Sequence, residues 1–127
     1  MKGITREMLK IYVPESNLDW MNYKLVKKQL TFHHIVKKSE GGLYTIDNGA
    51  LLNRISHDYL NVIEYSDHKT YEALNRIFKI VNNQRYEPDK EQREIIEYLL
   101  REYEYKHRED TTKKGKRLIK KEYLDRW

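Results

Sequence analysis

The chain has 127 residues, enough for one domain, and it has no cysteine, which excludes disulfides and structural zinc sites built on thiolates. No stretch approaches the about 20 apolar residues that span a bilayer, and the N-terminus lacks a secretory signal, so we expect a cytoplasmic protein without a membrane partner. The formal net charge of +5 favours an anionic partner such as nucleic acid, although many basic proteins bind none.

The first part of the chain predicts two short elements and then a strand. Residues 4–12 have the apolar spacing of a short helix, which Pro14 ends. Residues 18–26 predict a second short element with several apolar side chains. In residues 30–36, LTFHHIV, the β-branched and aromatic side chains predict a strand, and residues 37–42 predict the turn that follows it.

The middle of the chain predicts the rest of a hairpin and then helices. Residues 43–46 are expected to form the returning strand. Ser56 is expected to be the N-cap of a helix that carries His57 and Asn61, and Asp67 the N-cap of the next helix. The apolar residues of that next helix recur at helical spacing and are Tyr71, Leu74, Ile77, Phe78 and Val81.

The last third predicts one more amphipathic helix. Residues 82–88 predict a linker, and the helix that follows from Asp89 has an apolar face made of Ile95, Ile96, Leu99, Leu100 and Tyr103. Gly115 separates a final basic segment. The order of a helix, a β-hairpin and further helices predicts a small α+β fold.

One segment concentrates residues that carry chemistry, and they are His33, His34, Gly41, Gly42, Asn48, His57 and Asn61. Imidazoles and amides at this density are the components of a divalent-metal site with a general base beside it. Successive side chains of a strand point to opposite faces, so one histidine of the pair can bind metal while the other addresses water. His57 and Asn61 share a helix face, and a hairpin packed on that helix would bring His33 toward them.

The order of these residues resembles the ββα-metal fold of the HNH endonucleases, a family that includes the colicin nucleases and many phage enzymes. The shared features are the His-His-Ile start, the Gly-Gly turn, an Asn that opens an apolar turn, and the closing His-x-x-x-Asn. They cover about residues 30–64, a quarter of the chain. The resemblance implies a small ββα-metal core embedded in additional helices, and a phage or mobile-element origin.

The resemblance also implies a role for each residue. His34 would be the general base that takes a proton from the attacking water. His33, His57 and Asn61 would bind a single divalent metal ion, and Asn48 would hold the loop that positions the general base. The products would carry a 5′ phosphate and a 3′ hydroxyl.

Two departures from the family pattern concern the metal and the scaffold. Many relatives fold a zinc knuckle on cysteine pairs, which this chain lacks, so its helices must supply that support. Asn61 replaces the histidine of colicin-type enzymes. A His-His-Asn set accepts Mg²⁺ or Mn²⁺, our first expectation, and also Ni²⁺ or Zn²⁺, since the softness of the ligands does not choose among them.

Basic residues near the predicted site are expected to contact a nucleic-acid backbone without reading its bases, and these are Lys27, Lys28, Lys37 and Lys38. The basic tail would neutralise phosphates, or it is simply a solvated helix, and its basic residues are Lys113, Lys114, Lys116, Arg117, Lys120 and Lys121. Asn48 also has a simpler interpretation as a helix cap.

The sequence therefore predicts a DNA endonuclease with little sequence specificity, acting as a monomer or homodimer. Its expected divisions are a helical extension at residues 1–28, the HNH core at 29–83 and a basic helical extension at 84–127. One alternative is a DNA-binding or regulatory protein that retains the ββα scaffold without cleaving. Another is a protein-interaction module that uses the tyrosine-rich helix of residues 94–105.

Overall fold

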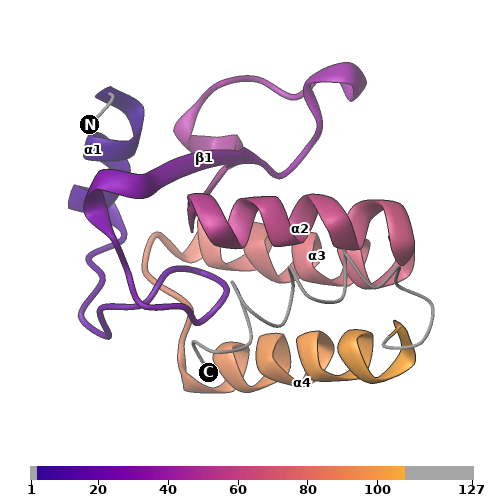
Figure 1. Ribbon diagram of the computed structural model, residues 1–127. Coiled ribbons are helices and arrows are strands. Elements are labelled where there is room, and N and C mark those ends of the chain that lie inside the picture. The colour runs from indigo at the N-terminus through magenta and orange to yellow at the C-terminus, as the bar shows by residue number, and fades with distance from the viewer. Residues whose placement is uncertain (1–2, 108–127) are drawn as a thin grey trace.

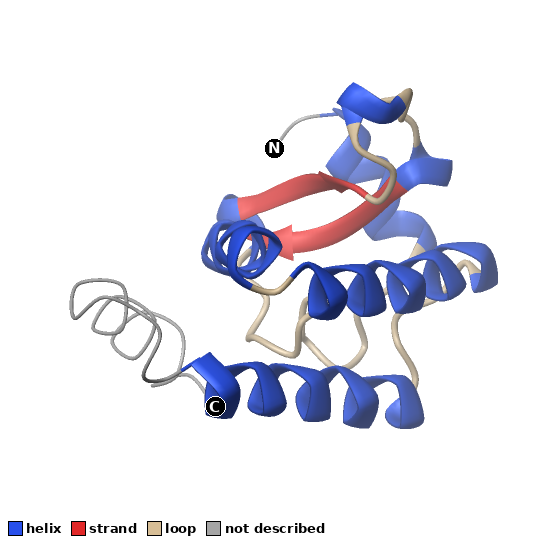
Figure 2. Ribbon diagram, turned by 90° about the vertical axis from the view of Figure 1, so that its right-hand side faces the viewer, coloured by secondary structure: helices blue, strands red, loops and turns tan. Residues whose placement is uncertain are grey.

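The computed structural model describes residues 3–107 and shows an α+β fold arranged in layers (Figures 1 and 2). A two-stranded antiparallel sheet forms one layer, with strands β1 (Leu30–His34) and β2 (Gly49–Asn53). Helices α2 (Arg54–Ser66) and α3 (His68–Gln84) form the next layer, between the sheet and the third layer, helix α4 (Lys90–His107). The predicted α+β class with a small ββα core is confirmed.

The remaining elements are short. Helix α1 (Gly3–Ile11) packs against β1, as its position beside the strand in Figure 1 shows, and it agrees with the helix predicted at residues 4–12. Three 3₁₀ helices lie in the connections, η1 (Lys27–Gln29), η2 (Lys38–Glu40) and η3 (Ile46–Asn48).

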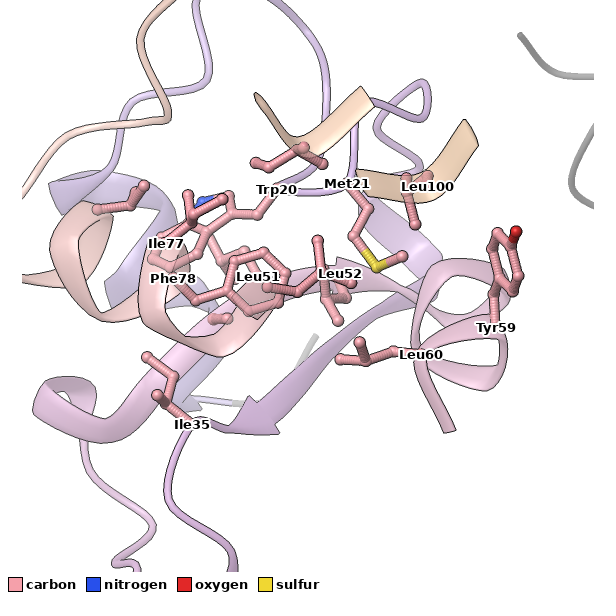
Figure 3. Packing of buried hydrophobic residues seen from close by; sticks show 14 of the residues in the cluster. Trp20, Met21, Ile35, Leu51, Leu52, Tyr59, Leu60, Ile77, Phe78 and Leu100 are labelled. Atoms are coloured by element: carbon pink, nitrogen blue, oxygen red, sulfur yellow. The ribbon is translucent and has the colours of Figure 1, made fainter. Parts of the chain in front are cut away.

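The core lies where the sheet meets α2 and α3, and the N-terminal loop reaches into it. Figure 3 shows Trp20 and Met21 of this loop packed with Leu51 and Leu52 of β2 and with Phe78 of α3. All five residues of β2 are buried, since the strand is covered on both faces. The loop therefore contributes to the hydrophobic core as the helices do.

The element predicted at residues 18–26 is neither a helix nor a strand. It is a loop with one isolated bridge, Leu18 to Lys24, and the buried carboxylate of Asp19 holds it. Asp19 Oδ1 accepts hydrogen bonds from the backbone N–H groups of Met21 (2.9 Å) and Tyr23 (3.0 Å), and its Oδ2 accepts from the N–H of Asn53 (2.9 Å). The loop owes its shape to these side-chain bonds, which a pattern of apolar residues does not reveal.

Two predicted boundaries in the hairpin are wrong. Residues 43–46 form no strand, because the side-chain amide of Asn48 takes up the carbonyl oxygens of Val36 and Leu43, and the returning strand begins only at Gly49. Ser56 is not the N-cap of α2, because β2 runs directly into a helix that begins at Arg54. Ser56 lies buried inside its first turn.

Helix α3 begins at the predicted N-cap. Asp67 Oδ1 accepts a hydrogen bond from the N–H of Thr70 (3.2 Å), as an N-cap residue should. The same carboxylate meets the C-terminal turn of α4, where His107 Nε2 lies 3.1 Å and Lys106 Nζ 3.6 Å from Asp67 Oδ2. Asp67 therefore joins the start of α3 to the end of α4.

These contacts lower the pKa of Asp67. Burial would raise it, but the hydrogen bonds from His107 and Thr70 and the charge of Lys106 outweigh burial and lower the pKa to about 2. Because the pKa of the folded state lies below the ordinary value of 3.8, the contribution of Asp67 to stability is complete above that value and is lost as the pH falls toward 2.

Within residues 3–107 no helix combines the length and apolarity that crossing a membrane requires. The basic segment predicted after Gly115 lies outside the described residues.

We expect Asp67→Ala to lower the free energy of unfolding at pH 7 by about 1 to 2 kcal/mol, the usual cost of losing an N-cap. Urea unfolding at several pH values measures this, and the difference from the parent should shrink below pH 4. Glu102→Ala is the matched control, because Glu102 is an exposed carboxylate on α4. A difference that stays constant down to pH 3 would contradict the assignment.

Candidate functional site

A surface cavity of about 280 Å³ brings together the predicted general base, His34, and the three predicted metal ligands, His33, His57 and Asn61. The other side chains that line it come from the loop after β1, from α2 and from α3, and they are Lys37, Lys38, Ser39, Glu64 and Tyr71. Asn48, Lys27 and Lys28 do not line this cavity.

His33 lies on the inner face of β1 and is only 4% exposed. Its ring packs edge-to-face against those of His57 (5.4 Å between centroids), Tyr71 (6.2 Å) and Phe78 (5.9 Å). Burial lowers the pKa of His33 to about 4, against the raising effect of a hydrogen bond to Asn75. The imidazole is therefore neutral at physiological pH, which is the form that binds metal.

His57 and Asn61 lie one turn apart on α2, on the side that faces the cavity. His57 Nδ1 lies 2.8 Å from the hydroxyl oxygen of Thr31, and Asn61 is exposed. Burial lowers the pKa of His57; Asp58 raises it, and Arg54 and His34 lower it further. Two neutral imidazoles and a carboxamide thus border the same space.

His34 leaves β1 on the side opposite His33. Its ring stacks on Tyr44 with centroids 6.0 Å apart and meets the edge of Phe32 at 4.8 Å, whereas the contacts of His33 are with α2 and α3. The alternation of a regular strand thus separates the paired imidazoles, while both still line the cavity.

Asn48 holds the loop that joins β1 to β2. Its Oδ1 accepts from the N–H of Val36 (2.8 Å), and its Nδ2 donates to the carbonyl oxygens of Val36 and Leu43 (3.0 Å each). Its backbone carbonyl accepts from the N–H of Ile35 (2.9 Å). These bonds fix the backbone directly after His34, so Asn48 acts on the site from outside the cavity.

The glycine pair belongs to the same arrangement. Gly41 has a φ of 91°, in the left-handed region, with open space around it. A Cβ on Gly42 would collide with the carbonyl oxygen of Val36 and lie 2.8 Å from Asn48 Nδ2. Gly42 is therefore required so that the loop can close on the Asn48 side chain.

The four predicted phosphate-contacting lysines fall into two groups. Lys37 and Lys38 line the cavity, and Lys37 forms an ion pair with Glu64 of α2 across it. Lys27 and Lys28 are exposed on η1 and lie apart from the cavity. The structure thus brings only one pair next to the histidines.

The residues that touch the site but were missing from the sequence prediction include Thr31, Glu64 and Asn75, besides Ser39 and Tyr71 of the cavity lining. Thr31 could have been found, because it precedes His33 by two positions and so shares its face of the strand. Glu64 could also have been found, since it follows Asn61 by three positions on the same helix. No sequence pattern indicates that Asn75 belongs to the site, because only the packing of α3 on the sheet brings it to His33.

The donors around the cavity suit a divalent cation. In the described part of the chain no three His, Cys, Asp or Glu side chains are grouped as metal ligands, and the candidate donors that line the cavity are His33, His57 and Asn61. Two neutral imidazole nitrogens and an amide oxygen leave coordination positions open for water and phosphate, as a catalytic site requires. The residues present fit the predicted ion.

The comparisons with known proteins agree with this geometry. Residues 22–61 match the family model described as HNH endonuclease, which covers β1, the Asn48 loop, β2 and the first half of α2. No curated protein matches the chain. No solved structure matches it either. The resemblance to the HNH family is confirmed, and it indicates a nuclease-type or DNA-binding function.

We expect Gly42→Ala to destabilise the protein by more than Gly41→Ala does. Strain at a positive φ costs Gly41→Ala about 1 to 2 kcal/mol. Gly42 has no positive φ, but Gly42→Ala must push away the Val36 carbonyl and displace the bonds of Asn48, which costs more. Urea unfolding measures both costs, and hydrogen exchange of the Val36 N–H reports on the loop itself. Equal costs with unchanged exchange at Val36 would show that the Asn48 contacts do not depend on Gly42.

Proposed function

We propose that this chain, whose residues 22–61 form an HNH segment, is an endonuclease that hydrolyses DNA phosphodiester bonds with one divalent ion and a histidine base. The observation that supports this most is the shared cavity of His33, His34, His57 and Asn61, into which residues from β1 and α2 converge. The match of residues 22–61 to the HNH endonuclease model supports a nucleic-acid substrate, and the positions of these side chains support the division of roles.

In this proposal His33, His57 and Asn61 hold the ion, and His34 accepts the proton of the attacking water. The bound ion would supply a Lewis acid for the phosphate and stabilise the charge that develops on the leaving 3′ oxygen. His34 can act in proton transfer because it lines the same cavity and its ring contacts, with Phe32 and Tyr44, are aromatic. Asn48 keeps the backbone after His34 in place.

The substrate backbone would be bound by Lys37 and Lys38 at the cavity, with Lys27 and Lys28 as contacts farther along it. Contacts of this kind give affinity without sequence specificity, and their strength falls as salt rises. Glu64 pairs with Lys37 in the free protein, so a phosphate must replace Glu64 as the partner of this lysine.

A plasmid-cleavage assay in Mg²⁺, Mn²⁺, Ni²⁺ and Zn²⁺ tests the proposal. Variants of the proposed general base and of a proposed metal ligand distinguish the two roles. His34→Ala should lower the cleavage rate about 10²- to 10⁴-fold, the usual contribution of a general base, and leave metal affinity unchanged. His57→Ala should lower metal affinity measured by calorimetry. His68→Ala is the matched control, because His68 is exposed on α3 and pairs with Glu72 outside this cavity.

Cleavage by His34→Ala at the parent rate would show that the assigned base is wrong. If the parent protein shifts DNA in a gel but leaves it intact with every metal, the chain is a DNA-binding protein on an HNH scaffold, and the nuclease proposal fails.

A further inference from the structure

The two predicted histidine ligands are each hydrogen-bonded, at one ring nitrogen, to a residue that has no assigned role. Thr31 lies 2.8 Å from His57 Nδ1, and Asn75 Oδ1 lies 2.8 Å from His33 Nε2. A hydrogen bond at one ring nitrogen determines which nitrogen of a neutral imidazole keeps its lone pair. These contacts therefore determine which ring nitrogen of each histidine has a lone pair available for a cation.

The direction of the bond between Thr31 and His57 follows from the neighbours of Thr31. A threonine hydroxyl has a single hydrogen, and Thr31 Oγ1 lies 2.8 Å from the carbonyl oxygen of Leu52, which can only accept. Two oxygen atoms this close repel each other unless a hydrogen lies between them, so the hydroxyl hydrogen points to Leu52. Thr31 Oγ1 must then accept from His57, whose Nδ1 carries the proton.

His33 has the reverse arrangement. Its Nε2 faces the side-chain oxygen of Asn75, which is an acceptor. His33 therefore carries its proton on Nε2. Asn75 belongs to α3 and lies outside the residues that match the HNH family, so the support comes from a helix added to the ββα core.

We propose that Thr31 and Asn75 are positioning residues that hold His57 and His33 in opposite tautomers, so that His57 offers Nε2 and His33 offers Nδ1 to the metal ion. The ligand part of this inference rests on the proposed function, while the tautomers belong to the metal-free protein. Because Thr31 is paired with Leu52 across the antiparallel strands, the hydrogen of its hydroxyl points to the Leu52 carbonyl, and the oxygen can accept from His57.

Nitrogen-15 NMR of histidine-labelled full-length protein tests the inference without metal or DNA. At pH 7.5 the long-range correlations should identify protonated Nδ1 in His57 and protonated Nε2 in His33. Addition of Zn²⁺, as a diamagnetic probe, should then shift His57 Nε2 and His33 Nδ1 most strongly.

The variants are Thr31→Val, which keeps the shape of the side chain without the hydroxyl, and Thr31→Ser, which restores the hydroxyl. Thr31→Val should leave His57 as a mixture of tautomers and weaken Zn²⁺ binding by about 10- to 100-fold, the usual effect of losing such a partner. Thr31→Ser should restore both the single tautomer and the affinity.

A protonated Nε2 in His57 of the parent overturns the inference, and so does a Thr31→Val variant with unchanged tautomer and affinity. A parent protein that shows the stated tautomers and Zn²⁺ shifts but cleaves no DNA supports the inference and contradicts the proposed function instead.

Discussion

The antiparallel register of β1 and β2 is the constraint on which the site depends. It pairs Thr31 with Leu52 and His33 with Ala50, so that Thr31 and His33 lie on the face that α2 and α3 cover. A shift of one residue would turn every side chain of β1 to the other face, exposing His33 and burying His34. The same register gives the Thr31 hydroxyl its acceptor and thereby orients the ring of His57. The burial of His33 and the contact between Thr31 and His57 thus both follow from one alignment of the two strands.

The segments outside the matched residues supply the support that a short ββα core cannot provide alone. Arg93 of α4 donates to the carbonyl oxygen of Asp19 (2.9 Å) and to Glu87 (2.8 Å), which joins the C-terminal helix to the N-terminal loop. Asp19 in turn binds the N–H of Asn53, where β2 becomes α2. Side chains of α3 complete the surroundings of His33. A chain without cysteine pairs thus holds its site through buried polar side chains and helix packing.

Periodicity in the sequence predicted the helices well, because each helix buries one regular face and Asp67 caps α3 as expected. It failed where side chains replace backbone partners. The side chain of Asn48 bonds to the carbonyl oxygens of Val36 and Leu43, so residues 43–46 form no returning strand. The apolar residues of 18–26 suggested a regular element, but hydrogen bonds to Asp19 hold this segment as a loop. The histidines and Asn61 that line the candidate site could be predicted as neighbours, because their spacing is local to one hairpin and one helix. Asn75 was not, since its contact with His33 joins positions 42 residues apart.

The most direct measurement of the central claim is a titration of the labelled protein with substoichiometric Mn²⁺, followed by paramagnetic broadening of its NMR signals. If one divalent ion binds where the imidazoles and the carboxamide converge, the side-chain signals of His33, His57 and Asn61 should broaden first and together. Broadening that begins instead at the larger cavity of about 730 Å³, which Glu87, Asp89 and Glu94 help to line, would contradict the account.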